Sequence, residues 1–96
     1  MDASQGAAPD PSKHGFQFPG DFELTALGVA SADLPAKVPA ILAGLGLAVL
    51  HETVRSRPSR EGRFVSVTVS FHCQTRAQYE AAHAALRADP DIHYTL

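Results

Sequence analysis

The side chains best suited to catalysis or metal binding are scattered along this 96-residue chain. Five histidines and one cysteine occur, and they are His14, His51, His72, His83, His93 and Cys73. No two histidines are four residues apart, as on one face of a metal-binding helix, and no Asp or Glu completes a recognised ligand set. A reactive thiol needs a base that lowers its pKa, and the sequence identifies none for Cys73. We expect no enzymatic activity, no metal site and no cofactor.

A cluster of arginines is the better candidate for binding. Half of the eight basic residues fall within nine positions, between Arg55 and Arg63. Guanidinium groups hold phosphate or carboxylate through paired hydrogen bonds. The predicted binding residues of this segment are Arg55, Arg57, Ser59, Arg60, Arg63 and Phe64. The same charges have a second interpretation, in which they keep an exposed hairpin soluble and discourage pairing between molecules.

These arginines flank the turn of a predicted β-hairpin. After Gly62, apolar residues at the odd positions from Val65 to Phe71 alternate with serine and threonine, which is typical of a strand with one buried face. Residues 58–62 form the turn. The preceding segment, residues 47–57, favours a strand without a clean period, which indicates a bulge or a partly exposed edge.

Two more strands and two helices are expected around this hairpin. Alternation predicts a first strand from Phe22 to about Val29 and a last strand over residues 92–96, in which Ile92, Tyr94 and Leu96 share one face.

The first helix should start at the cap Asp33 and end near Gly44, with Pro39 causing a kink or a late start. Thr75 and Gln78 form a capping-box pattern for the second helix, which buries Tyr79, Ala82, His83 and Leu86 and stops at Asp89 and Pro90.

The order strand, helix, strand, strand, helix, strand predicts an α+β, ferredoxin-like fold. In this fold two right-handed crossovers place both helices on one face of a four-stranded antiparallel sheet. The other face stays open to solvent. The residues expected there are Glu23, Thr25, Phe64, Ser66, Thr68, Ser70, His93 and Thr95.

Composition and charge limit the possible roles. With 45% hydrophobic residues, residues 18–96 suffice for one small domain, whereas residues 1–17 are too polar and small to pack and should form a disordered tail. The net charge of −2 gives no general attraction to nucleic acid. A single cysteine, no signal core and no apolar run of membrane-spanning length indicate a soluble, cytoplasmic protein without contact to membranes.

Two activities of this fold class fit poorly. RNA-recognition domains carry several aromatic residues on their central strands, whereas here Phe64 stands among Ser66, Thr68 and Ser70. Acylphosphatase-like enzymes pair an arginine with an asparagine, and the chain contains no asparagine. We therefore expect neither nucleic acid as a partner nor acylphosphatase activity.

Several short motifs resemble the YbeD-like family of small, uncharacterised bacterial proteins. The motif residues are Phe18, Pro19, Asp21, Phe22, Leu24, Gly28, Arg57, Pro58, Ser59, Gly62, Phe64, Ser66, Val67, Val69, Gln78, Leu86 and Pro90. The resemblance implies an ACT-like domain without an established activity, and gene neighbourhood in some relatives points to lipoate attachment. Residues 29–33 lack the Pro-Gly loop of amino-acid-binding ACT domains, so no such ligand is implied.

We therefore expect a non-enzymatic regulatory or protein-interaction module. It should act through self-association, as a dimer formed by pairing of edge strands, or through an unidentified protein partner. The alternative is an anion- or nucleic-acid-binding module that uses residues 55–63.

Overall fold

The structure is a computed structural model and describes residues 17–96. The tail predicted for residues 1–17 lies outside this range except for its last residue. Along the described chain, the elements are β1 (Gly20–Val29), the 3₁₀ turn η1 (Ala30–Ala32), α2 (Leu34–Gly44), β2 (Ala48–Pro58), β3 (Phe64–Cys73), α3 (Arg76–Arg87) and β4 (Ile92–Thr95).

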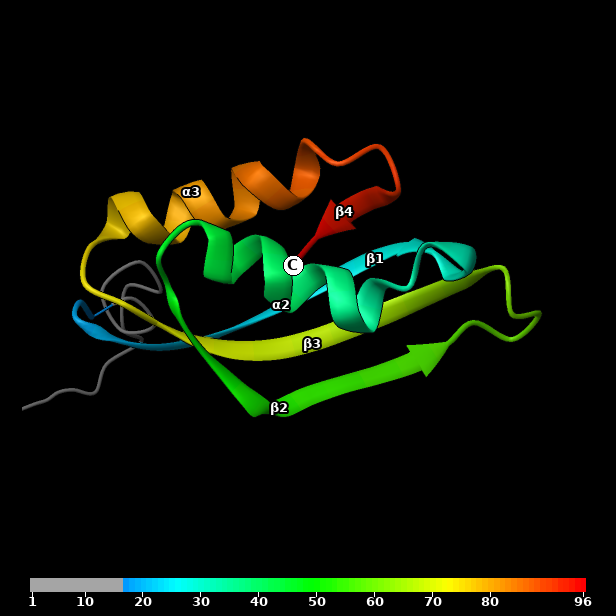
Figure 1. The fold of residues 1–96 in the computed structure, drawn as a ribbon, viewed down its shortest axis with the longest axis horizontal. Coiled ribbons are helices and arrows are strands. Elements are labelled where there is room, and N and C mark those ends of the chain that lie inside the picture. Colours follow the sequence, from blue (N-terminus) through cyan, green and yellow to red (C-terminus); the bar gives the residue numbers. More distant parts are fainter. Residues whose placement is uncertain (1–16) are drawn as a thin grey trace, which may run out of the picture.

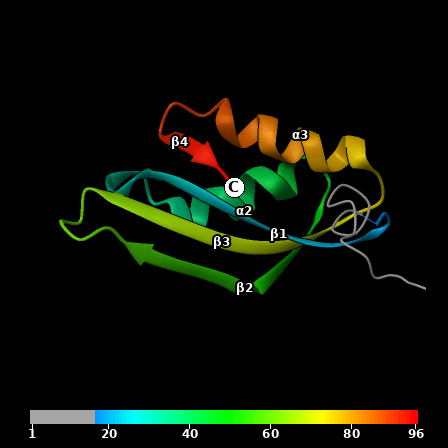
Figure 2. The ribbon, with the colours of Figure 1, turned by 180° about the vertical axis from the view of Figure 1, so that it is seen from behind.

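The four strands form one antiparallel sheet in the order β2-β3-β1-β4. Figure 1 views the sheet from the side of α2, and Figure 2 shows β1 and β3 from behind, with α2 beyond them. Both helices cover the same face, so the predicted α+β arrangement is confirmed. We call the helix side the covered face and the other side the open face.

Alternation along the two central strands fills the core. The odd residues of β3 are buried and the even residues are half-buried, while in β1 Leu24, Ala26 and Gly28 are buried. The buried apolar residues form one cluster beneath the helices, made of Leu24, Ala26, Leu34, Val38, Leu42, Leu47, Val65, Val67, Val69, Phe71, Cys73, Ala82, Leu86 and Ile92. The covered face of the sheet and the two helices thus share one apolar core.

Helix α2 starts where predicted, but the backbone of Asp33 caps it and the side chain does not. The side chain of Asp33 makes no capping hydrogen bond. Its backbone is left-handed (φ 55°), and its carbonyl oxygen accepts hydrogen bonds from the amides of Ala36 (3.1 Å) and Lys37 (3.0 Å). The helix starts at Leu34 and continues past the buried Pro39, so Pro39 does not delay its start.

Helix α3 is capped by the predicted pair. The Thr75 hydroxyl accepts a hydrogen bond from the Gln78 amide (3.2 Å), and the Gln78 side chain accepts one from the Gln74 amide (2.7 Å). The reciprocal bond therefore reaches one residue further back than in the usual capping box.

The last strand departs from its predicted alternation. Its register against β1 shifts between Leu27 and Gly28, so that Gly28 lies opposite Ile92 but Leu27 lies opposite Tyr94. His93 is the additional residue of this bulge. Ile92 therefore packs in the core, whereas Tyr94 turns to the open face. The prediction that the two share a face was wrong, and so was the placement of Thr95 on the open face, because its hydroxyl bonds His83 of α3 at 2.7 Å.

Candidate functional site

The open face carries a hollow of about 350 Å³ between β2 and β3, which we call the cationic hollow. It is lined by Arg55, Ser56, Arg57, Ser66 and Thr68. Arg55 lies opposite Thr68, and Arg57 lies opposite Ser66. Two guanidinium-bearing side chains thus stand beside two hydroxyl side chains. Of the six predicted binding residues, two line this hollow.

A bulge in β2 determines which residues reach the cationic hollow. Leu50 lies opposite Ser70 and Arg55 opposite Thr68, so five positions of β2 span two positions of β3. Within the bulge, the Thr53 hydroxyl replaces a backbone partner in the pairing of β2 with β3. It donates a hydrogen bond to the Leu50 carbonyl (2.6 Å) and accepts one from the Ser70 amide (2.8 Å). With regular pairing, Glu52 would lie opposite Thr68. The bulge therefore exchanges an acidic residue for a basic one at this point.

The two arginines of the hollow differ in their partners. Arg55 Nη2 lies 3.0 Å from the carboxylate of Glu23, and both side chains are more than half exposed. Within residues 17–96, Arg57 contacts no carboxylate. The Thr68 hydroxyl shares a 2.8 Å hydrogen bond with that of Thr25, and Ser66 Oγ lies 3.4 Å from the Arg57 carbonyl. Among the described residues, the charge of Arg57 thus has no carboxylate partner.

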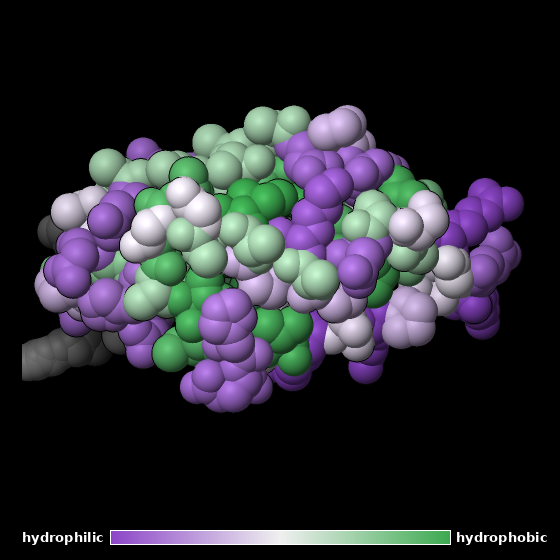
Figure 3. Space-filling view, viewed as in Figure 1, coloured by the Kyte–Doolittle hydropathy of each residue, from purple (hydrophilic) through white to green (hydrophobic). Residues whose placement is uncertain are grey.

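The other four predicted binding residues lie at the tip of the hairpin. A second hollow of about 270 Å³, the hairpin hollow, is lined by Ser59, Arg60, Glu61, Arg63 and Phe64. Figure 3 shows purple, hydrophilic side chains gathered at this end of the molecule. The structure thus divides the predicted set between two hollows.

Within the hairpin, Ser59 has a structural role. Its amide donates to the Phe64 carbonyl (2.8 Å), its hydroxyl accepts from the Phe64 amide (3.1 Å), and its carbonyl accepts from the Gly62 amide (3.0 Å). These bonds close the turn. The Phe64 ring meets the imidazole of His93 edge-on, with 5.3 Å between centroids.

Apolar side chains form a second surface on the open face, which we call the apolar patch. Leu27, Val29 and Phe64 are half-buried, and Tyr94 and Leu96 are 47% and 71% exposed. Leu27 pairs with Tyr94, and Val29 pairs with Phe64. The Leu96 backbone exchanges two hydrogen bonds with Thr25, which extends the ladder and keeps Leu96 on this face. The patch was missed because Tyr94 and Leu96 were expected inside.

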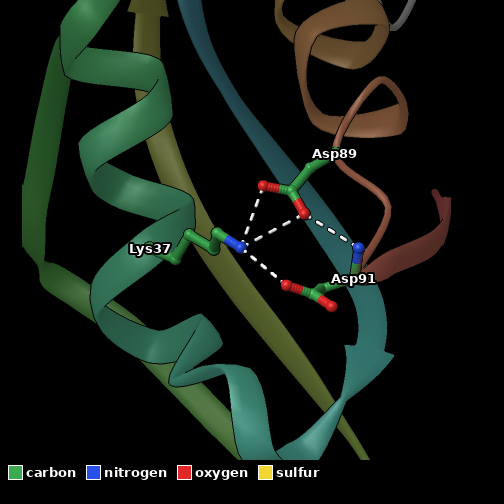
Figure 4. Close-up of polar contacts among 3 residues, drawn as sticks. All are labelled: Lys37, Asp89 and Asp91. Carbon is green, nitrogen blue, oxygen red and sulfur yellow. Dashed lines mark hydrogen bonds and ion pairs between the residues drawn. The ribbon is translucent and has the colours of Figure 1, made fainter.

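An ion cluster that the sequence did not reveal joins α2 to the loop after α3 (Figure 4). Lys37 Nζ lies 3.0 Å from Asp89 and 2.9 Å from Asp91. The hydrogen bonds that Lys37 Nζ donates to the two carboxylates, first to Asp91 and then to Asp89, raise the pKa of Lys37. The Asp91 amide, followed by Lys37, lowers the pKa of Asp89. The two ion pairs of Lys37 hold the two segments together.

Two of the groups that could do catalysis, Cys73 and His83, lie on the covered face, where Cys73 is buried and His83 is partly buried. Cys73 is buried, and burial raises the pKa of its thiol, so the thiol stays protonated. Burial, with a smaller effect from Arg87, lowers the pKa of His83. Its Nε2 atom is buried without a hydrogen-bond partner, and its ring meets Tyr79 at 4.8 Å between centroids.

Two other kinds of site are not found within residues 17–96. No three side chains of His, Cys, Asp or Glu are grouped there so that they could hold a metal ion. Among the described helices, none is both long and apolar enough to cross a membrane.

The sequence of this chain is similar to those of a family of unknown function. Residues 13–96 match the family described as a protein of unknown function, DUF493. A UPF0250 protein of Xanthomonas axonopodis is 47% identical over 87 residues, which cover 91% of this chain and 95% of the relative. A UPF0250 protein of Xylella fastidiosa is 45% identical with the same coverage.

Solved structures support the fold. Protein HP0495 from H. pylori matches with a TM-score of 0.70 at 15% identity, over 96% of this chain and 98% of its own. The C-terminal domain of the MgtC protein from Mycobacterium tuberculosis gives 0.63 at 13%, over 84% and 87%. The YbeD-like resemblance is confirmed, and this chain belongs to the DUF493 (UPF0250) family of uncharacterised bacterial proteins.

Proposed function

We propose that this protein is a non-enzymatic interaction module that associates through the open face of its sheet, with a second copy or with another protein. The apolar patch carries this proposal. Tyr94 and Leu96 are 47% and 71% exposed, and their neighbours on the face include Leu27. Proteins commonly use a contiguous exposed apolar surface to bind another molecule.

The open face is better suited to association than the sheet edges. At one edge, β2 is interrupted by its bulge and carries Arg55 and Arg57, and both features discourage strand pairing. At the other edge, β4 has only four residues. Two open faces can instead pack against each other as in a sandwich, about 10 Å apart. A regulatory role would follow if the bound partner were an enzyme.

The test is the oligomeric state of patch variants. Sedimentation equilibrium should show a dimer whose population grows with concentration, and Tyr94→Ser with Leu96→Ser should weaken it about tenfold or more, because each apolar side chain contributes about 1.5–3 kcal/mol when buried. Leu45→Ser is the matched control, because Leu45 is 44% exposed at the end of α2, outside the patch.

If the wild-type protein is monomeric, the same variants test binding to another protein. Cross-linking in the native cell should then yield a complex that the double variant loses and Leu45→Ser keeps. A complex or dimer that tolerates the double variant contradicts the proposal.

Salt dependence separates this function from anion or nucleic-acid binding by residues 55–63. Association through apolar burial should change little between low and moderate salt. Binding to phosphates should weaken steeply over the same range.

A further inference from the structure

We propose that the cationic hollow binds the phosphoryl group of a small molecule. The hollow lies on the same open face as the apolar patch but shares no lining residue with it, and this proposal does not rest on the association proposed above. It adds a ligand to a protein for which neither the family nor the fold assigns one.

The two positive charges that line the hollow favour the binding of an anion. Arg55 and Arg57 are two residues apart on one strand, so they share a face with about 7 Å between their Cα atoms. Like charges placed this close repel each other. Glu23 is the one carboxylate within residues 17–96 that contacts either of them. A bound anion would remove the remaining repulsion.

The donors of the hollow fit a phosphoryl group. Each guanidinium has five N–H donors, and Glu23 contacts only Nη2 of Arg55. The Ser66 hydroxyl makes a long hydrogen bond, 3.4 Å, which it can exchange for a ligand at little cost. Two forked cations and hydroxyl donors match three phosphoryl oxygens better than the two oxygens of a carboxylate.

The size of the hollow favours a small molecule. Its volume of about 350 Å³ lies at the lower end of the range for small-molecule sites. A nucleic-acid strand needs a longer basic track with aromatic rings for stacking. Beyond the hollow, Arg63 lies 4.0 Å from Glu61, and the Phe64 ring is already in contact with His93.

Protection of an exposed edge explains part of the arrangement. Any charged side chain on β2 discourages aggregation. Such protection needs neither arginine in particular nor hydroxyl groups directly opposite. Arg57→Lys separates the two explanations, because it keeps the charge but loses the planar fork.

The experiment is a titration of the full chain with inorganic phosphate at constant ionic strength. Two-dimensional NMR monitors the amide resonances at each step. We expect saturable shifts that concentrate on residues 55–57 and 66–68. Arg57→Gln should weaken binding about tenfold, as expected for a lost charged hydrogen-bond donor, and Arg57→Lys should also weaken it.

Arg60→Gln is the matched control, because it removes the same charge from the neighbouring hairpin hollow. It should change the affinity by less than about twofold, since Arg60 does not line the cationic hollow and an exposed charge outside it is screened by salt. Thermal unfolding of each variant checks that the fold is kept.

Three results would overturn the site. The first is an absence of saturable shifts, and the second is an equal loss of affinity in Arg57→Gln and Arg60→Gln. The third is tight, salt-sensitive binding of a short single-stranded RNA without saturable binding of phosphate, which would assign the basic segment to nucleic acid.

Discussion

The two faces of one strand, β3, differ in what they require of a side chain. Toward the helices, Val67, Val69 and Phe71 are completely buried. Toward the open face, Ser66, Thr68 and Ser70 are half-buried and touch other polar groups. The covered face must be apolar for the domain to fold, whereas the open face can vary. We therefore place stability on the first and binding on the second.

The largest effect should come from Phe71, the largest fully buried side chain. Phe71→Ala should lower the free energy of unfolding by about 3–5 kcal/mol, because it removes buried surface and leaves a cavity. Phe64→Ala on the open face of the same strand should cost clearly less. Urea denaturation measures both. Equal losses would show that side chains on the open face contribute as much to stability as those in the core, which contradicts the account.

A substitution at Gly28 tests how closely the loop before β4 approaches β1. A Cβ at this position would collide with the Asp91 carbonyl oxygen and would lie 2.7 Å from Leu34 Cδ1. Gly28→Ala should therefore destabilise the domain by about 1–3 kcal/mol, the usual cost of overpacking.

The control for this change is Gly44, which lies in the last turn of α2. A methyl group added to Gly44 would have no neighbour within 4 Å. Gly44→Ala should leave stability unchanged or raise it by about 0.5–1 kcal/mol. Equal melting temperatures for the two variants would contradict the close packing of β1 against the loop before β4.

The ion cluster should contribute less, and its contribution should depend on pH. Lys37→Met leaves Asp89 and Asp91 without their cation, so it should destabilise the domain at pH 7. Because the pKa of Asp89 is lowered below its ordinary value of 3.8, the cluster stabilises the fold above that pH and the contribution is lost as the pH falls further.

Because the pKa of Lys37 is raised above 10.5, the same contribution is present below that pH and is lost above it. Thermal melts across these ranges should show a steeper loss for the wild type than for Lys37→Met. Parallel curves would mean that the cluster adds nothing.

The smallest effect should come from His83. Burial lowers its pKa below 6.5, so the folded state holds the neutral imidazole and the unfolded chain takes up the proton first. Its stabilising contribution is present above pH 6.5 and falls as the pH decreases toward the folded pKa.

Arg87 acts on His83 through its charge, and the ring of Tyr79 packs against the imidazole. Burial raises the pKa of Tyr79, so Tyr79 stays neutral in this range. His83→Gln should flatten the dependence of stability on pH below 6.5. An unchanged slope would assign that dependence to another group.

The sequence predicted those parts of the fold that depend on local patterns. The alternation from Val65 to Phe71 identified the core strand, and the Thr75–Gln78 pair located the start of α3. These patterns work because side-chain direction and helix capping depend on residues near in sequence.

The site was predicted only in part, because it depends on register. The bulges in β2 and β4 decide that Arg55 lies beside Ser66 and Thr68 and that Tyr94 lies on the open face. The missing period of residues 47–57 indicated a bulge or an edge there without giving its position, and the bulge in β4 has no local signature. The Lys37 cluster joins residues 52 and 54 positions apart. A single sequence does not record such contacts.

The most direct test of the claim that the covered face provides stability and the open face binds is a dilution series, in which NMR monitors the amide resonances. If the open face is the association surface, the shifts that change with concentration will concentrate on Thr25, Leu27, Tyr94 and Leu96. Changes confined to the exposed sides of α2 and α3 would contradict the account.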